Sequence, residues 1–448
     1  MRIMKDSGIE WIGKIPKDWE VVPFKAYFTT GKGLSFTKAD LTPQGHAVVS
    51  YGQVHSKVNT GTRLDDSLLR YIPDSIAENG EASRMNKGDF IFADTSEDLE
   101  GCGNCVYVDR DIELYAGYHS VTAKPKVQYD NKFFAYYFQT LCWRSQIRSR
   151  VTGIKVYSIS QSIINKTFIF VPPLSIQQKI ANYLDKVCGE VDELISLQET
   201  MIEELKAYKQ SVITEAVTKG LNPNVPMKDS GIDWIGEIPE HWGNSAPLKW
   251  FVSIILGKML QSNSKNSDDS LEYYICAKDV HFEGIEYSDL KRMYFSPEEK
   301  LQYKVQKGDM LVVEGGAGAA GASIVKKDLD NVYIQNSIMI ARPVKNVDIS
   351  FVYYSLYSLA SRGYVDYVCN KATIPHFTKE KLSRTIITFP PLDEQRSIAS
   401  YLDTKCSEID SLIALKQTKI EELKEYKKSV IYEYVTGKKE VVGKPKNS

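Results

Sequence analysis

Two long segments of this chain are each written twice. Residues 4–19 read MKDSGIEWIGKIPKDW and residues 227–242 read MKDSGIDWIGEIPEHW, with 12 of 16 positions identical. A second pair of segments begins at Pro172 and Pro390 and matches at 29 of 49 positions. The copies are offset by 223 and 218 residues. A chain repeated in this way is expected to build the same structural unit twice.

The second repeat predicts two long helices. After each Pro-Pro pair, apolar residues recur at steps of four and three, the spacing that keeps one stripe of a helix against a partner helix. Proline suits the entry into a helix, and Gly220 and Gly437 are expected to end the two helices. The first stripe contains Ile180, Leu184, Val187, Val191, Leu194, Gln198, Met201, Leu205, Tyr208 and Val212. The second contains Ile398, Leu402, Ile409, Leu412, Leu423, Tyr426 and Val430, with interruptions at Lys405, Lys416 and Lys419.

We predict that these two helices pack against each other in antiparallel orientation. The alternative is that each faces the core of an ordinary domain. Between the repeats lie residues 20–170 and 243–388, which share a pattern but little identity. Each stretch has Lys-Gly-Asp followed by a strand-like run, at Lys87 and Lys307, and then an aromatic-rich run, at Phe133 and Phe351. The mixture of strand-like and helical runs predicts an α+β fold for each.

The expected fold class is therefore α+β, with two α+β domains related by pseudo-two-fold symmetry and separated by two long antiparallel coiled-coil helices. The expected boundaries are residues 1–174 for the first domain and 175–220 for the first helix. Residues 221–392 form the second domain, 393–438 the second helix and 439–448 a tail. Repeated segments that stay similar around two divergent inserts suit a two-fold protein that presents two different surfaces.

The charge distribution indicates local basic patches. Because the formal net charge is only −1, any surface for nucleic acid has to be local. Residues 124–166 carry eight basic residues against one acid, and residues 342–388 carry seven against three. Cations in such patches gain affinity by releasing phosphate counterions, and Arg or Asn can read base edges. A solvated basic face is the alternative interpretation.

Two groups of residues are candidates for DNA contact. The basic stretches contribute Arg144, Arg148, Arg150, Lys155, Tyr157 and Arg362. Glycine-flanked polar loops near the start of each insert contribute Lys32, Ser35, Lys38, Lys258, Asn263 and Lys265, although these loops can equally be surface turns. The acids Asp94, Glu97, Asp98 and Glu100 would repel phosphate. A carboxylate can accept from cytosine N4, but a solvated loop is the simpler interpretation of these acids.

Motifs that suggest chemistry lack their required context. Residues 316–321 match the dinucleotide-binding glycine pattern, but no long helix follows and the first insert has no counterpart. We expect a glycine-rich hairpin there. Cys102 and Cys105 form a lone CxxC without the second ligand pair that structural zinc needs. The chain also lacks HExxH, a phosphate-binding loop and the Asn-Pro-Pro-Tyr run of amino-methylating enzymes. We therefore expect no catalysis, metal or cofactor in this chain.

The sequence also bears on location. Its start lacks the features of a signal peptide, and no stretch approaches 18 consecutive apolar residues. Seven scattered cysteines suit a reducing interior better than a disulfide framework. We expect a cytoplasmic protein with no membrane association.

The repeated signatures resemble those of a known family. Ser7 to Pro16 with Trp19, the copy from Ser230 to Pro239 with Trp242, and Pro-Pro-Leu followed by Gln177 or Gln395 resemble the specificity subunit of Type I restriction-modification systems. The resemblance covers the whole chain in the order domain, helix, domain, helix. It implies two target recognition domains that each read one half of a bipartite asymmetric DNA site. It also implies that the helices set the length of the unread spacer.

The resemblance further implies partners and residue roles. The partners are double-stranded DNA, two adenine methyltransferase subunits and two ATP-dependent restriction subunits. S-adenosylmethionine, ATP and Mg²⁺ are expected in those subunits. Loops that lie near DNA in the family correspond to residues 152–155 and 371–376, which adds Lys371, Thr373 and His376 to the candidates. Methyltransferase helices are expected to pack near Leu205, Tyr208, Val212, Leu423, Tyr426 and Val430.

Two other classes of function remain as alternatives. The chain can be a self-contained DNA methyltransferase or nuclease, which the missing motifs disfavour. It can also be a coiled-coil adaptor that binds only proteins, in which case it would confer no sequence-dependent retention of DNA.

Overall fold

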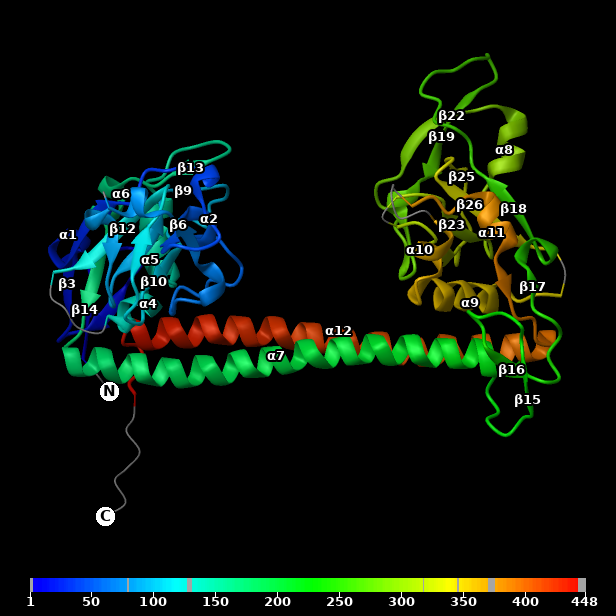
Figure 1. Cartoon of the computed structure of the whole chain (residues 1–448). Helices are drawn as coiled ribbons and strands as arrows, with labels where there is room; N and C mark the ends of the chain where they lie inside the picture. The colour runs from blue at the N-terminus through cyan, green and yellow to red at the C-terminus, as the bar shows by residue number, and fades with distance from the viewer. Residues whose placement is uncertain are drawn as a thin grey trace. The chain divides into compact units, whose positions relative to one another are not determined.

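The computed structural model describes residues 3–78, 80–126, 131–316, 318–344, 346–369 and 375–441. The chain divides into two compact units. The first unit is Met1–Gln198 with Thr418–Ser448, and the second is Glu199–Gln417. Two long helices, α7 (Leu174–Lys219) and α12 (Leu392–Val435), contribute residues to both units. Each unit therefore contains one α+β domain and part of each long helix (Figure 1).

The predicted fold class is confirmed, because two α+β domains accompany two long helices that pack together. In the first domain the short helices are α1 (Phe24–Tyr27), α2 (Tyr51–Val54), α3 (Asp74–Ala77), α4 (Lys132–Tyr137), α5 (Leu141–Arg148) and α6 (Gln161–Asn165). In the second domain they are α8 (Pro297–Tyr303), α9 (Ile349–Ser361), α10 (Tyr364–Val368) and α11 (Lys379–Arg384).

The first domain is built on an antiparallel sheet of four strands. Their order is β10 (Cys105–Tyr107), β8 (Phe90–Ala93), β12 (Ser120–Pro125) and β4 (Phe28–Lys32). Successive side chains of a strand point to opposite faces. Phe90 and Phe92 accordingly belong to an aromatic core with α4 and α5, while Ile91 and Ala93 belong to a separate core. That second core is shared with a sheet of order β6 (Arg70–Ile72), β5 (His46–Val49), β11 (Leu114–Ala116) and β7 (Arg84–Met85).

The second domain repeats this plan with different side chains. Its four-stranded sheet has the order β18 (Val252–Leu256), β26 (Ile338–Pro343), β23 (Met310–Val313) and β24 (Ala322–Ile324). The accompanying sheet has the order β22 (Lys291–Phe295), β19 (Ser270–Ile275) and β25 (Val332–Ile334). Both domains contain one parallel pair, β5 with β11 and β19 with β25. Where the first domain has Phe90 and Phe92, the second has Met310 and Val312, so the plan tolerates an exchange of its core.

The repeated Lys-Gly-Asp turns have the same conformation in both domains. Gly88 and Gly308 have φ values of 96° and 89°, a left-handed conformation that favours glycine. The next residue closes each turn, because a carboxylate oxygen of Asp89 accepts from the Asn86 N–H at 2.8 Å and Asp309 accepts from the Gln306 N–H at 2.8 Å. The pattern shared by the two inserts is thus the turn that leads into each central strand.

The first repeat forms a hairpin in each unit. The strands are β1 (Met4–Asp6) with β2 (Lys14–Pro16), and β15 (Met227–Asp229) with β16 (Glu237–Pro239). Asp6 accepts from the Gly8 N–H at 2.9 Å, and Asp229 accepts from the Gly231 N–H at the same distance, 2.9 Å. After each hairpin a tryptophan, Trp19 or Trp242, is buried. The sequence signature therefore encodes a small structural element.

The remaining strands are short. They are β3 (Glu20–Pro23) paired with β14 (Phe168–Val171), β9 (Thr95–Ser96) with β13 (Tyr157–Ser158), β17 (Ala246–Pro247) with β27 (Ile386–Ile387), and β20 (Val280–His281) with β21 (Gly284–Ile285). The pairs β3–β14 and β17–β27 join the start of each domain to its last strand before a long helix.

Contacts between α7 and α12 are antiparallel within each unit. In the first unit Asp192 pairs with Lys427 at 2.6 Å, and the Tyr183 ring lies 4.4 Å from that of Tyr434. In the second unit Lys209 pairs with Asp410 at 2.7 Å. Asp192 and Lys427 stand 218 residues from Asp410 and Lys209, so the repeat forms the same ion pair twice. This confirms the predicted antiparallel packing.

The apolar seam differs by one position from the predicted stripe. Leu194, Tyr208, Leu412 and Tyr426 are 46%, 50%, 47% and 52% exposed, so these four stripe residues do not lie in the seam. Ile195 and Ile202 in α7 and Ile413 and Ile420 in α12 lie in the seam instead. The predicted Leu205 and Leu423 also lie there, and all six residues are partly or fully buried. Apolar residues occupy adjacent positions here, as at Leu194 and Ile195, so helical spacing alone fits either choice.

Each domain is attached to a long helix by the same phenol–carboxylate bond. The hydroxyl of Tyr136 in α4 donates to Asp185 of α7 at 2.7 Å, and that of Tyr354 in α9 donates to Asp403 of α12 at 2.7 Å. Burial, together with these bonds, raises the pKa of both tyrosines well above the usual range. Each phenol therefore remains a donor at physiological pH.

Several further expectations can be compared with the structure. The described part of the glycine-rich stretch, residues 316 and 318–321, lies between the antiparallel strands β23 and β24, which confirms the hairpin. Cys102 and Cys105 are buried free thiols. Within the described ranges, no group of His, Cys, Asp and Glu is suited to a metal ion. None of the helices described is long and apolar enough to cross a membrane. The predicted tail lies outside the described residues from position 442 onward.

Gly437 provides a test of how the end of α12 is packed. Its φ is 67°, and an added Cβ would lie 2.4 Å from Pro16 Cγ and 3.0 Å from the Trp19 ring. Gly437→Ala should therefore lower the free energy of unfolding by on the order of 2 kcal/mol. Gly189→Ala is the control, because this helical glycine has nothing within 4 Å and should stabilise the protein by about 0.5–1 kcal/mol. Urea unfolding measures both, and equal effects would contradict the packing.

Candidate nucleic-acid interface

Loops distant in the sequence meet at one edge of the first domain's main sheet. The pairing places the ends of β4 and β8 beside the start of β12, since Lys32 faces Val121 and Ala93 faces Ser120. Beyond β8 the chain forms β9, which pairs with β13, and the Ile159 N–H donates to the Asp94 carbonyl at 2.7 Å. In Figure 1, β9 and β13 lie on the side of the first unit that faces away from α7 and α12.

The second domain forms the same loop junction. Val313, at the end of β23, faces Ile338 at the start of β26. The Phe377 N–H donates to the Glu314 carbonyl at 2.6 Å, and Gly315 forms a β-bridge with His376. In both domains the loop after the central strand is thus tied to the loop before the last short helix. We call these loop clusters the reading edges of the two domains.

A glycine lets two segments of the chain cross closely at each reading edge. A Cβ on Gly33 would lie 1.9 Å from the Gly117 carbonyl oxygen, and one on Gly257 would lie 2.4 Å from that of Gln335. Both positions therefore require glycine. The loops that follow carry the exposed candidates Ser35 and Lys38 in the first domain and Asn263 and Lys265 in the second, and Lys32 just before Gly33 is also exposed.

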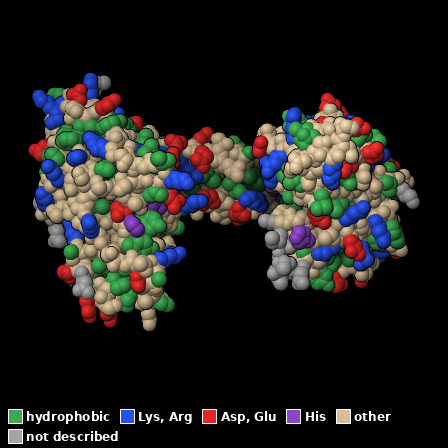
Figure 2. Space-filling view, turned by 90° about the horizontal axis from the view of Figure 1, so that it is seen from above, with side chains coloured by type: hydrophobic (Ala, Val, Ile, Leu, Met, Phe, Trp, Pro, Cys, Tyr) green, Lys and Arg blue, Asp and Glu red, His purple; other side chains and the backbone are tan. Residues whose placement is uncertain are grey.

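A cavity of about 800 Å³ opens at the first reading edge. Its lining is Tyr51, Gly52, His55, Thr95, Ser96, Glu97, Asp98, Glu100, Gly101, Asn104, His119, Arg144 and Val156. Carboxylates, histidines and an amide thus line the same cavity. On the face drawn in Figure 2, Lys and Arg side chains are dispersed among acidic and hydrophobic ones and form no continuous basic field. This lining suits the reading of base edges better than attraction of phosphates alone.

Most residues of this lining were missed by the sequence analysis. Tyr51 and His119 follow β5 and β11, and because these strands run in parallel their ends meet, leaving the two rings 5.5 Å apart. His55 Nε2 donates to the Thr95 carbonyl at 2.8 Å. No spacing in the sequence links these residues. Only the parallel pairing, which joins residues some 70 positions apart, brings them together.

The arginines of the first basic stretch are committed to bonds inside the domain. Arg148 Nη2 donates to the Glu100 carbonyl at 2.6 Å, and Arg150 Nη1 donates to the Gln146 carbonyl at 2.6 Å. Arg144 donates to the Phe138 carbonyl and to Gln139 Oε1, at 3.2 and 2.6 Å. Burial lowers the pKa of Arg144. Arg144 and Arg148 are partly buried with internal partners, Arg150 is exposed, and the phosphate contacts expected of all three stay predictions.

Lys155 and Tyr157 lie at the first reading edge. Lys155 is exposed in the loop before β13, between Ile154 and Val156, which are 97% and 52% exposed. Tyr157 is half-buried within β13. Lys155 is thus accessible to a phosphate.

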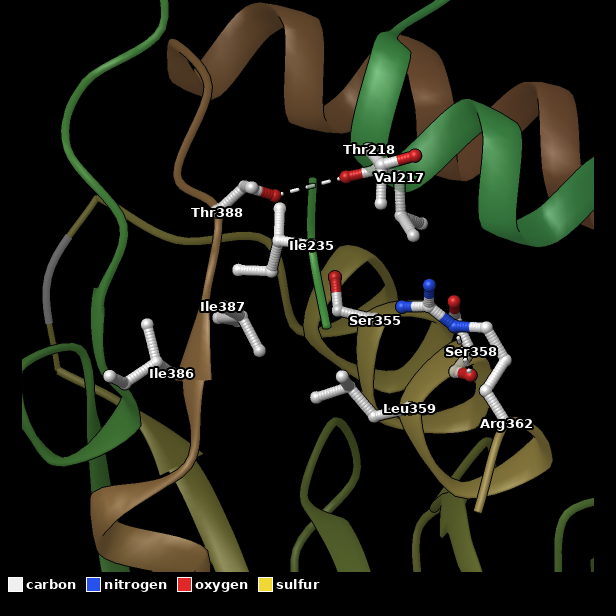
Figure 3. A pocket seen from close by; sticks show the side chains of 10 residues that line it. All are labelled: Val217, Thr218, Ile235, Ser355, Ser358, Leu359, Arg362, Ile386, Ile387 and Thr388. Atoms are coloured by element: carbon white, nitrogen blue, oxygen red, sulfur yellow. Dashed lines mark hydrogen bonds between the residues drawn. The ribbon is translucent and has the colours of Figure 1, made fainter. Parts of the chain in front are cut away.

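Of the second domain's candidates, Lys258 is buried and the exposed Arg362 lies beside the long helix α7. Lys258 is only 7% exposed, forms an ion pair with Glu299 and donates to the Tyr294 carbonyl at 2.8 Å. A buried, paired lysine of this kind is a packing element, so the prediction of DNA contact is corrected. Arg362 lines a small cavity beside Val217 and Thr218 of α7, where its Nε donates to the Ser358 carbonyl at 3.3 Å (Figure 3).

Arg362 is exposed, and its predicted DNA contact stays a prediction. It lies beside the long helix and not at the reading edge, and partial burial lowers its pKa. His376 is exposed at the reading edge, where the bridge to Gly315 holds its backbone. Lys371 and Thr373 lie outside the described residues.

The predicted partner-binding residues fall into three groups. Tyr208 and Tyr426 are 50% and 52% exposed. Leu205 and Leu423 are half-buried in the helix seam. Val430 is buried in the first unit's core, and the partly buried Val212 packs against a core of the second. The exposed leucines Leu194 and Leu197 and their equivalents Leu412 and Leu415 were not predicted as a surface.

Comparison with known proteins identifies the class of this chain. Residues 16–207 and 251–425 match the family described as the Type I restriction modification DNA specificity domain. The two matched regions together cover most of the chain, which therefore belongs to this family. It is a DNA specificity subunit with two target recognition domains, and specificity subunits of this family are non-catalytic within the restriction-modification complex. Both alternatives, a self-contained enzyme and a protein-only adaptor, are thereby set aside.

Individual relatives extend over nearly the whole chain. The putative type I restriction enzyme MjaX specificity subunit of Methanocaldococcus jannaschii is 26% identical over 447 residues, which cover 95% of each chain. The EcoKI specificity subunit of Escherichia coli K12 is 21% identical over 430 residues, covering 90% of this chain and 86% of the relative.

Solved structures share the fold. A chain from a study of complex assembly and conformational transition in the type I R-M system has a TM-score of 0.69 at 18% identity, covering 94% of this chain and 98% of that one. The HsdS subunit from Thermoanaerobacter tengcongensis has a TM-score of 0.50 at 17% identity with the same coverage, 94% and 98%.

Lys155 provides a test of the first reading edge. If its ammonium neutralises a DNA phosphate, Lys155→Ala should weaken binding and reduce the slope of log affinity against log salt by about one, without changing the preferred bases. Gel-shift titrations at several salt concentrations measure this slope. Lys14→Ala, which removes an exposed lysine from the hairpin β1–β2, is the control and should leave the slope unchanged. A slope that is equal for both variants would remove Lys155 from the interface.

Proposed function

We propose that the two reading edges each read one half of a bipartite, asymmetric DNA site. The observation that carries this proposal is the repeated loop junction, tied by Asp94 to Ile159 in one domain and by Glu314 to Phe377 in the other. The junctions agree in backbone bonding and differ in side chains. Two domains that share an architecture but differ in the side chains of their reading edges are suited to two different half-sites.

The long helices set the length of the spacer between the half-sites in this proposal. Each runs without interruption for more than 40 residues, 46 in α7 and 44 in α12. At 1.5 Å per residue a helix of this length spans roughly 70 Å. The ion pairs Asp192–Lys427 and Lys209–Asp410 support a fixed register between the helices. A fixed register between two helices makes the half-site separation a geometric property of the chain.

The exposed leucines and tyrosines of the helices suit a docking role. Each unit bears the same set, Leu194, Leu197 and Tyr426 in the first and Leu412, Leu415 and Tyr208 in the second. Exposed apolar residues at helical spacing are typical of a surface that a partner helix covers. Two equivalent sets suit two adenine methyltransferase subunits, one for each.

The same proposal assigns the chemistry to the partners. S-adenosylmethionine serves the methyltransferase subunits, and ATP and Mg²⁺ serve two restriction subunits that join the same complex. Family membership and the absence of metal-ligand groups from the described residues support this division. The complex acts on double-stranded DNA in the cytoplasm.

An insertion in the helices tests the spacing. Seven residues inserted after both Leu197 and Leu415, which are equivalent positions, should keep the two helices in register and lengthen each by about 10 Å. The unread gap should therefore grow by about 3 base pairs while the bases of both half-sites stay the same. Methylation mapping of cells that express the variant with its methyltransferase measures the gap. Altered half-site bases with an unaltered gap would overturn the proposal.

A pair of leucine substitutions tests the docking surface. Leu197→Ser with Leu415→Ser should reduce co-purification of the methyltransferase subunit at least tenfold, because each removes exposed apolar area from a covered surface. Leu221→Ser is the control, since it removes a leucine that is 43% exposed and lies outside both helices. Retention equal to that of the unmodified chain would place the methyltransferase elsewhere.

A further inference from the structure

The segment Ser96–Gly101 forms one wall of the cavity at the first reading edge and is tightly bonded to itself. The Ser96 hydroxyl donates to the Asp98 carbonyl at 2.7 Å, and the Gly101 N–H donates to Asp98 Oδ1 at 2.6 Å. Ser96 is buried, whereas residues 97–100 are exposed. We call this segment the wall loop. Its carboxylates are therefore presented to the cavity by a loop with a defined shape.

Two arginines of α5 hold this loop against the domain. Arg148 Nη2 and Arg144 Nη1 both donate to the Glu100 carbonyl, at 2.6 and 3.4 Å. α5 itself is anchored in the aromatic core through Trp143 and Ile147, which are fully buried. The arginines thus connect the wall loop to the rigid part of the domain. A guanidinium that donates to a carbonyl of its own chain has fewer donors left for a phosphate.

We propose that Arg144 and Arg148 are positioning residues for DNA recognition, which hold the wall loop and do not neutralise DNA phosphates. This inference rests on the proposed function of the first reading edge. It reverses the simplest interpretation of a basic stretch in a DNA-binding domain, which assigns every arginine to the backbone. The two roles have different consequences, because a positioning residue changes which bases are accepted and a phosphate contact changes the salt dependence.

The position of the wall loop decides what the cavity offers to a base. Glu97 and Glu100 have no hydrogen bond or ion pair through their side chains among the residues that the structure describes. Near a phosphate these carboxylates would be repelled, whereas a base edge with an amino group supplies a donor for them. A shift of the loop therefore changes the acceptors facing the bases and leaves the phosphate contacts at Lys155 in place.

Among the described residues of the second domain, no arginine donates to the equivalent loop. There the Ala320 N–H donates to the Val313 carbonyl at 2.9 Å, and the Gly321 N–H donates to the Gly318 carbonyl at 2.8 Å. The loop is closed by its own backbone, as suits a glycine-rich hairpin. Loss of the arginines should accordingly affect only the half-site that the first domain reads.

The test uses the full chain in complex with its methyltransferase and duplexes that carry the methylated site or single-base changes in either half. In Arg148→Ala, discrimination against changes in one half-site should fall by on the order of tenfold, and the salt slope should change by less than about half a unit. Gly101→Ala should act alike without removing a charge, because its Cβ would lie 2.5 Å from Ser96 Oγ and displace the loop. Lys155→Ala is the contrasting control, with a lower slope and unchanged discrimination.

The outcomes separate this inference from the proposed function. If the unmodified complex fails to discriminate between the duplexes, the proposed function itself is wrong. If it discriminates, and Arg148→Ala lowers the salt slope by about one while discrimination is kept, the arginine contacts phosphate and the positioning role is overturned. Unchanged discrimination in both Arg148→Ala and Gly101→Ala would overturn it as well.

Discussion

The packing of α7 against α12 is the interaction on which the rest of this structure depends. Each of the two helices buries a seam of isoleucine and leucine against the other. The ion pairs Asp192–Lys427 and Lys209–Asp410 add register to this apolar contact. An apolar seam alone tolerates sliding, whereas charged pairs at equivalent positions favour one alignment. The hairpins and domains attach to this frame at repeated sites.

Much of the fold could be predicted from the sequence because the repeat presents the same structural pattern in two copies. A segment that is preserved in two copies indicates a shared environment, and the two long helices and their antiparallel packing were predicted on that basis. The glycine hairpin was predicted because no long helix follows the glycine pattern and the first insert has no counterpart of it. The seam was misplaced by one position at Leu194 and Tyr208. Both an exposed and a buried stripe of this helix are apolar, so periodicity could not tell which stripe meets the partner helix.

The candidate site was less predictable for a different reason. Composition indicates where cations are, but the direction of a side chain depends on which carbonyl or carboxylate lies nearby. Lys258 is turned inward by Glu299, and Arg148 by the carbonyl of Glu100. The rings of Tyr51 and His119 meet only because β5 and β11 run in parallel. None of these neighbours is encoded in local spacing.

The phenol–carboxylate bond between each domain and its helix has a consequence for how such a protein can change. Tyr136 and Tyr354 belong to inserts of low mutual identity, yet each meets an aspartate of the repeated frame at the same distance, 2.7 Å. This attachment requires little of the insert beyond a correctly placed tyrosine. A different insert is compatible with the unchanged long helices if it places a tyrosine at this position and has the glycine turn that leads into the central strand. Exchange of whole inserts is therefore an accessible route to a new target and requires no change in α7 or α12.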